Sequence, residues 1–384
     1  MNTFSISRLA PLLGVVLCAA SLTLQAAPSF KQALEALRAT GPEGAGQAQA
    51  EQAWRVVAQQ KPDKLLAVLS AMNGAHDLAL NWLRPAAESI ADRAIASGSL
   101  PTAALERFST DFKQHSRARR LAWELIARAD MAKAQSMLPK YLGDPGADLR
   151  REAIAQVIQA GDQSIKNGQK PEAIAHYRRA LTHAREADQL EDLAKKLKEQ
   201  GETVALAAQF AWVKDWKVVG PFNNLGGVGY DTPFGPETQG LDLQAYEGAQ
   251  GKVSWIPFAA TDDYGTVDFN KPFTKLKGVA GYATSTLVST KAQDVVIRLG
   301  SQNAWKVWLN GKLLFGRDEY HRGREIDQYQ LPAKLKKGDN VLLIKACQNE
   351  QKEEWTQEWQ FSLRVTTPAG EPIRFDTFQR AQLD

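Results

Sequence analysis

Residues 305–315 read WKVWLNGKLLF, two apolar runs separated by Asn310-Gly311. A tight two-residue turn of type I′ needs a positive φ at both central residues, and Asn followed by Gly tolerates this conformation well. The stretch therefore predicts two antiparallel strands joined by a short hairpin.

The hairpin belongs to a series of short β-rich runs in the C-terminal part of the chain. The other runs are VSWIPF (253–258), GYATSTLVS (281–289), DVVIRLG (294–300), DNVLLIKAC (339–347) and EWQFSLRV (358–365). In the last run apolar and polar residues alternate, which is the period of a strand with one buried face. Short strands without helical patterns between them predict an antiparallel β-sandwich.

The region between Ser29 and Val213 has a different period. Apolar residues recur there at spacings of three and four, among many Ala, Leu, Glu and Lys residues, and this pattern predicts helices. The expected fold class is therefore multidomain α and β, with a helical domain over 28–213 and a β-sandwich over 214–384.

Three segments of the helical region are similar to one another: WLRPAAESIADRA (82–94), ARRLAWELIARAD (118–130) and LRREAIAQVIQAG (149–161). When they are aligned on Ala87, Ala122 and Ala153, each has an arginine three residues earlier and Ala, Ile or Val four residues later. One such repeat cannot bury its apolar face alone, so stacking into an α-solenoid is expected. GADLRREAIAQVI (146–158) resembles the second half of a HEAT repeat. A non-repetitive helical bundle is the alternative.

The next stretch, GDQSIKNGQKPEAIAHYRRAL (161–181), resembles a single tetratricopeptide repeat. Its residues at the motif positions are Gly161, Gly168, Ala173, Tyr177 and Ala180. The resemblance implies two antiparallel helices that approach closely at the small residues, with the tyrosine in the groove between them. One copy of this motif cannot form a binding groove by itself.

A further resemblance covers the predicted hairpin. RLGSQNAWKVWLNGKLL (298–314) and LKKGDNVLLIKACQN (335–349) resemble the galactose-binding-like jelly roll, and in particular the sugar-binding domain of family 2 glycoside hydrolases. WKVVGPF (216–222) resembles a segment that opens such modules in secreted bacterial proteins. The resemblance implies a jelly roll over 214–384 and carbohydrate binding as its function.

Metal and cofactor sites are not expected. Related sandwiches of the protective-antigen type often carry S-D-D-G before the hairpin, and the two aspartates bind calcium. This chain has Ser301-Gln302-Asn303-Ala304 there, and neutral amides replace carboxylates poorly on a hard cation. The five histidines form no zinc motif, and no nucleotide-binding or nucleophile motif occurs, so we predict no metal, no cofactor and no catalytic residue.

The N-terminus has the pattern of a secretory signal peptide over residues 1–27. Arg8 precedes a largely apolar stretch, Leu9–Leu24, and Gln25-Ala26-Ala27 is a small-residue cleavage region. A lipoprotein signal would use Cys18, but the small residue that normally precedes such a cysteine is missing. The expected location is secreted or periplasmic. After cleavage Cys347 is the remaining cysteine, so no internal disulfide forms, and its strand-like surroundings predict a buried inert thiol.

Composition narrows the range of partners. The formal charge of +4 over 384 residues is too small to indicate nucleic-acid binding. No segment after the signal region has 18 consecutive apolar residues, so no membrane span is predicted. The expected partners are a glycan, bound by the sandwich, or a protein, bound by the helical repeats.

Two loops around the strand at 339–347 combine aromatic and polar side chains: GRDEYHRGREIDQYQ (316–330) and QNEQKEEWTQE (348–358). Loops at one end of a sandwich meet in space and often carry function. We therefore predict a ligand site made of Arg317, Tyr320, His321, Tyr329, Asn349, Glu350 and Trp355. The alternative is that Trp355 and Tyr329 close the end of the sandwich as core residues.

Acidic pairs occur at Asp262-Asp263 and Glu353-Glu354. Glycoside hydrolysis needs two carboxylates at a defined separation across a cleft, which sequence neighbours do not establish. We interpret both pairs as solvated loop charges.

These observations favour a non-catalytic secreted protein that binds or recognises carbohydrate, with the helical repeats as an interaction scaffold. Two alternatives remain at this point: an adaptor that binds proteins without binding glycans, and a glycan-processing enzyme whose site the motifs do not reveal.

Overall fold

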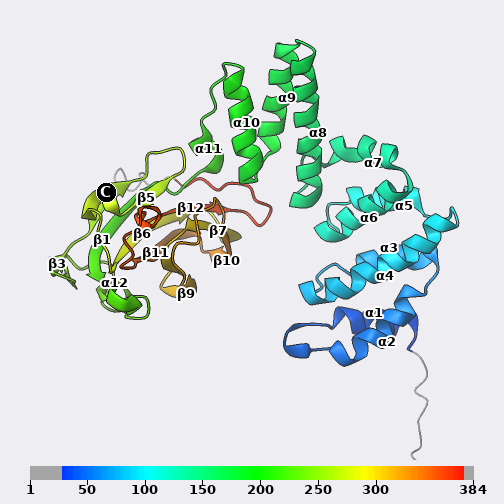
Figure 1. Ribbon diagram of the computed structural model, residues 1–384. Helices are drawn as coiled ribbons and strands as arrows, with labels where there is room; N and C mark the ends of the chain where they lie inside the picture. The colour runs from blue at the N-terminus through cyan, green and yellow to red at the C-terminus, as the bar shows by residue number, and fades with distance from the viewer. Residues whose placement is uncertain (1–27, 376–384) are drawn as a thin grey trace, which may run out of the picture. The chain divides into compact units, whose positions relative to one another are not determined.

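The computed structural model describes residues 28–375 (Figure 1). Helices occupy residues 30–210 and antiparallel strands occupy most of 215–366. The change from helices to strands therefore comes where the sequence period changes. The predicted signal peptide and Cys18 lie outside the described residues.

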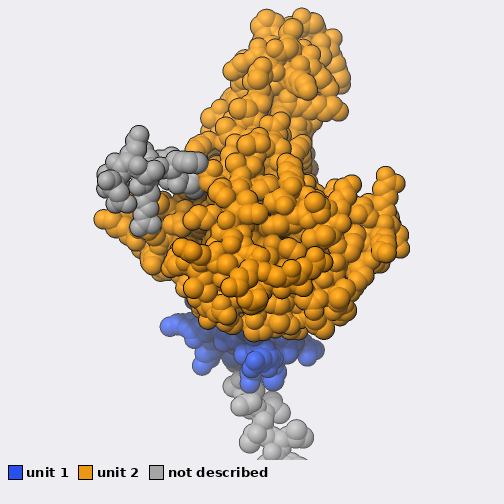
Figure 2. Space-filling view, turned by 90° about the vertical axis from the view of Figure 1, so that its left-hand side faces the viewer, with its two compact units in different colours: residues 1–101 blue, residues 102–384 orange. Residues whose placement is uncertain are grey.

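Two compact units divide the chain, residues 1–101 and residues 102–384 (Figure 2). The second unit contains helices as well as all the strands of residues 28–375. The expected boundary at 213/214 thus marks the change of secondary structure and lies inside the second unit.

The first unit consists of helices, and side chains cap the starts of the first and the fourth of them. Ser29 and Gln32 form a capping box at the first helix, and the His76 Nδ1 atom accepts a hydrogen bond of 3.2 Å from the backbone N–H of Leu78. Such caps satisfy N–H groups that have no partner within the helix. The helices are α1 (Phe30–Arg38), α2 (Gln47–Ala58), α3 (Leu65–Ser70) and α4 (Asp77–Ala96).

The helices of the second unit include a closely packed antiparallel pair. A Cβ atom added to Gly161 would lie 2.5 Å from the Cε1 atom of Tyr177, and the Tyr177 hydroxyl donates a hydrogen bond of 2.7 Å to Asp162. The glycine therefore allows the approach that the sequence indicates. The helices before the strands are α5 (Thr102–Thr110), α6 (Ser116–Ala129), α7 (Met131–Met137), α8 (Ala147–Lys166), α9 (Lys170–His183), α10 (Ala187–Glu199) and α11 (Leu206–Phe210). Two short helices, α12 (Gly235–Thr238) and α13 (Asn270–Phe273), lie among the strands.

Arginines that the sequence aligns have different environments. Arg119 is buried and binds both carboxylate oxygens of Asp144. Arg150 is also buried and donates to the Asp144 carbonyl at 2.8 Å and to Glu186 at 2.6 Å. Arg84, in the first unit, is exposed and pairs with Glu88 of its own helix. Only the second and third segments of the alignment thus carry a buried arginine at this position.

Two antiparallel sheets make up the C-terminal half. The six-stranded sheet has the order β4-β1-β6-β11-β8-β9, and the four-stranded sheet has the order β10-β7-β12-β5. A short hairpin of β2 (Tyr246–Gly248) and β3 (Gly251–Val253) is separate. The strands of the two larger sheets are β1 (Asp215–Asn223), β4 (Ile256–Ala259), β5 (Thr266–Asp268), β6 (Val279–Ser289), β7 (Gln293–Ser301), β8 (Ala304–Leu309), β9 (Lys312–Arg317), β10 (Tyr329–Leu335), β11 (Gly338–Gln348) and β12 (Gln360–Thr366).

Residues of both sheets pack into one apolar core, in a sandwich-like arrangement. The Trp216 ring meets the Phe361 ring edge to face at 5.2 Å, and the Trp359 ring stacks on Phe269 at 4.9 Å. Tryptophans within strand-like runs are expected in the core, and Trp305 and Trp359 are buried there, whereas Trp308 is only half-buried and packs against the smaller apolar cluster of the six-stranded sheet. Cys347 is buried too, and burial raises the pKa of its thiol to about 12, which keeps it protonated and unreactive.

The predicted hairpin at Asn310-Gly311 is confirmed. Leu309 of β8 pairs with Lys312 of β9, and the two turn residues have φ values of 53° and 78°. The Asn310 side chain also accepts a hydrogen bond of 3.0 Å from the backbone N–H of Val341. The turn is therefore tied to β11 as well as closing its own hairpin. Among the described residues, no helix is both long and apolar enough to cross a membrane.

Replacing Gly311 with valine should destabilise the protein by about 1–3 kcal/mol, because a β-branched residue is strained at positive φ. Urea unfolding measures the loss. Leu313→Val, at an exposed position within β9, is the matched control and should cost much less. Equal stabilities of the two variants would contradict the role assigned to the turn.

Gly161→Ala should also destabilise the protein. The added methyl group would overlap the Tyr177 ring, and overpacking of this kind costs about 1–3 kcal/mol, which exceeds the gain in helix propensity of up to about 1 kcal/mol. Gly143→Ala is the control, because that glycine has open space around it. A Gly161→Ala protein that melts at or above the temperature of the control would disprove the close approach of α8 and α9.

Candidate functional site

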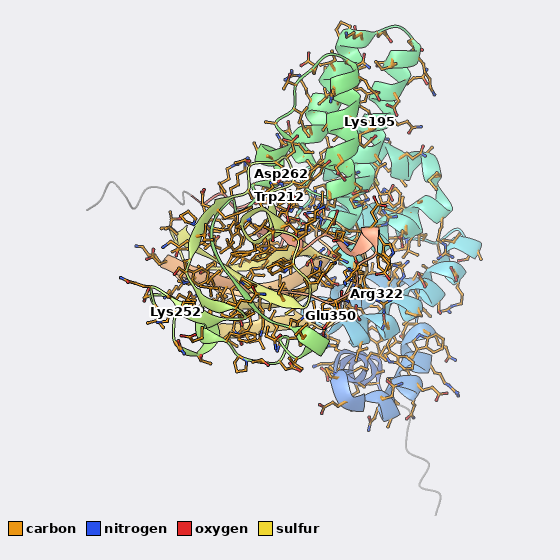
Figure 3. All side chains as sticks on the ribbon, turned by 60° about the vertical axis from the view of Figure 1, so that its left-hand side comes forward. Lys195, Trp212, Lys252, Asp262, Arg322 and Glu350 are labelled. Carbon is orange, nitrogen blue, oxygen red and sulfur yellow. The ribbon has the colours of Figure 1, made fainter. Side chains whose placement is uncertain are left out.

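Strand register brings the two predicted loops to the same end of the sandwich. Ala304, at the start of β8, pairs with Cys347 near the end of β11. Arg317, at the end of β9, pairs with Trp305 near the start of β8. The segment after β9 and the segment after β11 therefore leave the six-stranded sheet at the same end of its strands. In sequence, β10 and β11 separate the two segments. Figure 3 labels Arg322 and Glu350, one residue from each loop.

A direct contact joins the two loops at His321 and Asn349. The His321 Nε2 atom lies 2.8 Å from the Asn349 Oδ1 atom, which also accepts the backbone N–H of Gln351 at 3.2 Å. Because Oδ1 accepts, the histidine Nε2 must carry the hydrogen. The His321 backbone N–H donates to the Gln302 carbonyl at 2.6 Å, which fixes the residue to the edge of the sandwich.

Trp355 presents its ring to solvent beside this contact. It lies 5.4 Å from the His321 ring at an interplanar angle of 88°, and 61% of the residue is exposed. The next residue, Thr356, is fully buried. The Thr356 backbone carbonyl accepts hydrogen bonds from the side chains of Gln348 at 2.9 Å and Lys277 at 2.8 Å. The buried threonine anchors the turn and holds the tryptophan outward, so Trp355 does not close the end of the sandwich.

Glu350 and Leu225 extend the surface next to Trp355. One Glu350 carboxylate oxygen accepts the backbone N–H of Gly226. A Cβ atom added to Gly278 would lie 2.6 Å from Leu225 and 3.5 Å from Glu350, so these side chains meet over a glycine. Leu225 is 61% exposed, like Trp355. The surface thus combines two exposed apolar groups with one carboxylate.

Tyr320, next to His321, is held in place by a buried asparagine. Its hydroxyl accepts a hydrogen bond of 3.0 Å from the side chain of Asn224, which is fully buried and also donates to the Gln348 carbonyl at 3.1 Å. Burial raises the pKa of Tyr320, so the phenol stays neutral. Three buried polar atoms around it have no hydrogen-bond partner among the described residues: His321 Nδ1, Gln302 Nε2 and Asn224 Oδ1.

We use the name Trp355 cluster for Tyr320, His321, Asn349, Glu350 and Trp355. The other two residues of the predicted site make their contacts elsewhere. Arg317 pairs with Glu319 at 3.1 Å, and the Tyr329 ring lies 4.8 Å from Trp305 and packs against the core. Tyr329 therefore has the packing expected of a residue that closes the end of the sandwich.

A loop held by a buried lysine covers the outer face of the six-stranded sheet. Lys345 is fully buried, and its ammonium group donates to the carbonyls of Tyr230 and Thr232 at 3.1 and 2.7 Å and to Glu237 at 2.9 Å. Burial lowers the pKa of this lysine. The loop continues from Leu225 of the exposed surface, so the lysine fixes the segment that completes the site.

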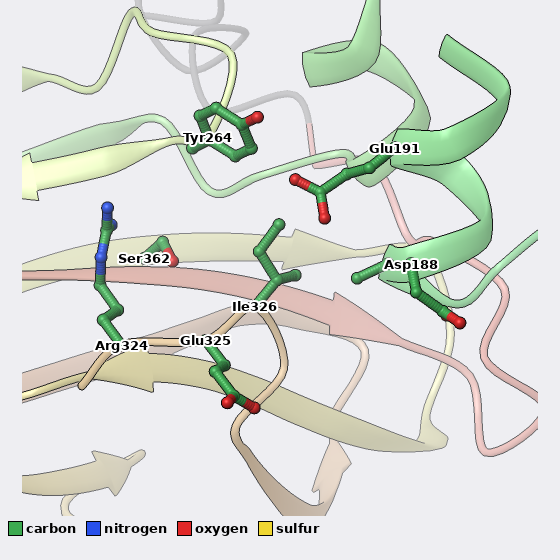
Figure 4. Close-up of a pocket in the computed structure, with 8 residues that line it drawn as sticks. Asp188, Glu191, Tyr264, Arg324, Glu325, Ile326 and Ser362 are labelled. Atoms are coloured by element: carbon green, nitrogen blue, oxygen red, sulfur yellow. The ribbon is translucent and has the colours of Figure 1, made fainter. Parts of the chain in front are cut away.

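A second site, which the sequence does not indicate, lies between α10 and the sandwich. It is a pocket of about 480 Å³ to which α10 contributes Glu191 and the loops contribute Tyr264 and Arg324 (Figure 4). The Glu191 carboxylate points into the pocket, whereas Asp188 points away. Burial and the neighbouring Glu191 raise the pKa of Tyr264. These residues are too far apart in sequence for any local pattern to connect them.

Two nearby carboxylates, Asp188 and Asp262, have structural partners. Arg151 binds both oxygens of Asp188 at 2.7 and 2.6 Å, and Asp262 accepts from the backbone N–H of Tyr264 at 2.8 Å. No group of three or more His, Cys, Asp or Glu residues suited to a metal ion occurs within residues 28–375.

Comparison with known proteins identifies no relative. No family model and no curated protein matches the sequence. Among solved structures, the Faecalibacterium prausnitzii β-glucuronidase is 15% identical with a TM-score of 0.25, over 41% of this chain and 31% of that one. An anti-sigma factor domain-containing protein from Clostridium clariflavum is 12% identical with a TM-score of 0.25, over 42% and 45%. The PA14 domain of MpAFP antifreeze protein is 8% identical with a TM-score of 0.20, over 25% and 47%.

This chain therefore covers less than half of each of those proteins. With TM-scores this low, the similarities assign neither a fold nor a function.

Trp355→Ala should leave the free energy of unfolding within about 1 kcal/mol of the parent value, because surface substitutions have small effects. Trp359→Ala, only four residues away, should cost about 3–5 kcal/mol, because that ring is fully buried and its N–H donates to the Ala346 carbonyl at 3.0 Å. Chemical denaturation of both variants measures the contrast. A large loss for Trp355→Ala would place its ring in the core.

Proposed function

We propose that this protein is a non-catalytic, secreted or periplasmic carbohydrate-binding protein and that the Trp355 cluster contacts the sugar. The single observation that carries the proposal is the exposed Trp355 ring held by buried neighbours. Sugars have apolar C–H faces that stack on aromatic rings, and an indole offers a large rigid surface for this contact.

Pre-organisation supports this assignment. Thr356 fixes the turn on one side of Trp355, and His321 contacts the ring from the other loop. A side chain that is already ordered loses little conformational freedom on binding, so more of the contact energy contributes to affinity. An exposed tryptophan without such support would pay that entropic cost.

Polar groups beside the ring suit sugar hydroxyls. Glu350 uses one oxygen for Gly226, and its second oxygen has no partner in the described part of the chain. An ionised carboxylate accepts hydrogen bonds from hydroxyls, and the Asn349 amide nearby can both donate and accept. Leu225 adds an apolar contact for a second sugar residue.

The non-catalytic part of the proposal rests on the sequence, in which neighbouring acidic residues do not establish the paired carboxylates that hydrolysis needs. Glu350 is the acidic member of the Trp355 cluster, and glycoside hydrolysis needs a second carboxylate about 5–9.5 Å away across the bond. The acidic pair at Asp262-Asp263 includes a carboxylate already engaged in a turn.

We further propose that residues 28–213 form an α-solenoid of HEAT-like repeats with one tetratricopeptide-like motif at 161–181, and that 214–384 is a galactose-binding-like jelly roll. The packing of Gly161 against Tyr177 and the two antiparallel sheets support these assignments. In this proposal the helices act as an interaction scaffold. A protein-binding adaptor is the second candidate function, because helical repeats offer extended surfaces for partners.

An array of bacterial, plant and animal glycans, probed with the chain lacking residues 1–27, tests the proposal. Trp355→Ala should weaken binding to any hit at least about tenfold, equivalent to about 1.4 kcal/mol, and Glu350→Gln should also weaken it. Lys352→Ala, an exposed change in the same loop, is the control and should bind like the parent. Absence of any hit would favour the adaptor function, and release of sugars from a hit would show that the protein is an enzyme.

A further inference from the structure

A pocket of about 550 Å³ lies in the first unit, far in sequence from the Trp355 cluster. Trp54 lines it from α2, and Leu78, Asn81 and Trp82 line it from α4. Gln47, the first residue of α2, completes the wall. All of these residues belong to the first unit, so the pocket does not depend on the second unit.

The pocket face of α4 follows from helical spacing. Leu78, Asn81, Trp82 and Pro85 are separated by three and four residues, so they lie on one face of the helix. The buried residues of α4, such as Leu83 and Ile90, belong to its other sides. The face with the tryptophan is therefore not needed for the core, and Leu78 is 41% exposed.

Pro85 leaves an additional acceptor at this face. Proline has no backbone N–H, so the Asn81 carbonyl, four residues earlier, lacks its usual helical donor. Asn81 thus presents a carbonyl as well as a side-chain amide. A proline within a helix has a cost in stability, and here the result is a polar group beside an aromatic wall.

Several polar groups around the pocket have no partner within the described residues. The side-chain amides of Gln47 and Asn81 and the indole N–H groups of Trp54 and Trp82 make no hydrogen bond to the protein. Thr40, which also lines the pocket, is only 2% exposed, and its hydroxyl is unpaired. None of the residues that line the pocket carries a formal charge.

This combination defines the chemistry of a ligand. The lack of charged residues disfavours anions and cations, which need a compensating charge or a metal when they are desolvated. The two indole rings favour a ligand with apolar faces that can stack on them. The two side-chain amides and the Thr40 hydroxyl favour a ligand that has both hydrogen-bond donors and acceptors. A short neutral saccharide has all three properties, because each ring has C–H faces and hydroxyls that donate and accept.

A polypeptide fits less well. An extended chain advances about 3.3 Å per residue, so a pocket of this size holds only a few of its residues. We therefore infer that the Trp54–Trp82 pocket is a second carbohydrate site, specific for neutral sugars.

Two sites on one chain would bind a polysaccharide by avidity. Once one site has bound a polymer, the second binding event becomes intramolecular, and its effective concentration rises. The Trp54–Trp82 inference goes beyond the proposed function, and it stands or falls on different residues.

The test uses neutral hexasaccharides of glucose, xylose, mannose and N-acetylglucosamine as probes, with isothermal titration calorimetry on the chain lacking residues 1–27. Trp355→Ala serves as the background that removes the sandwich site. In that background binding should persist, and adding Trp54→Ala and Trp82→Ala should weaken it at least tenfold. Gln47→Ala and Asn81→Ala, both at exposed positions, should weaken it several-fold without lowering the melting temperature.

Gln49→Ala is the matched control, because Gln49 is exposed on the same helix and does not line the pocket. It should bind like the background protein. Complete loss of saccharide binding with Trp355→Ala alone would overturn the inference of a second site. The proposal that the Trp355 cluster binds sugar would still stand. Binding that responds only to the pocket variants would support the inference and remove the role of Trp355. Capture of uncharged peptides, in place of saccharides, by the pocket would also overturn it.

Discussion

The register of the six-stranded sheet is the constraint on which the candidate site depends. The Asn310-Gly311 turn fixes β8 against β9, and Asn310 also bonds to Val341 of β11, so three strands are aligned from one turn. A slip of one residue would turn every side chain of β8 to the opposite face and bring Trp305 out of the core. The same register places the C-terminal ends of β9 and β11 at one end of the sheet, which is why His321 can contact Asn349.

Buried amides hold the irregular segments at that edge. The Asn303 side chain donates to the Glu358 carbonyl at 3.1 Å and accepts from the backbone N–H of Gln360 at 3.0 Å, and the Gln348 side chain donates to the Thr356 carbonyl. Backbone groups in loops must find partners when they are buried, and these amides provide them. Asn303 therefore serves the backbone of a neighbouring loop.

In the second unit, charge pairs link helices to strands. Arg364 of β12 is fully buried, binds Asp327 and donates to the Arg185 carbonyl, just after α9, at 3.0 Å. Arg185 in turn reaches the Ala369 carbonyl at 2.8 Å and pairs with Glu371. A buried charge is costly unless it is fully paired, so removing one partner would be strongly destabilising. These links explain why helices and sheets share a compact unit although the sequence period changes at residue 213.

Local signals in the sequence determined the hairpin, the helical and strand regions and the burial of Trp305 and Trp359, because turn dihedral angles and side-chain periods depend on neighbouring residues. They also gave the small residue of α8 that admits Tyr177. Only the tertiary structure decided that Trp355 is exposed while Tyr329 packs on the core, since both are aromatic residues in polar loops. The pockets at Trp54 and Glu191 likewise combine segments whose meeting depends on long-range packing. Strand order and helix packing are set by the burial of whole faces, and no short stretch of sequence contains that information.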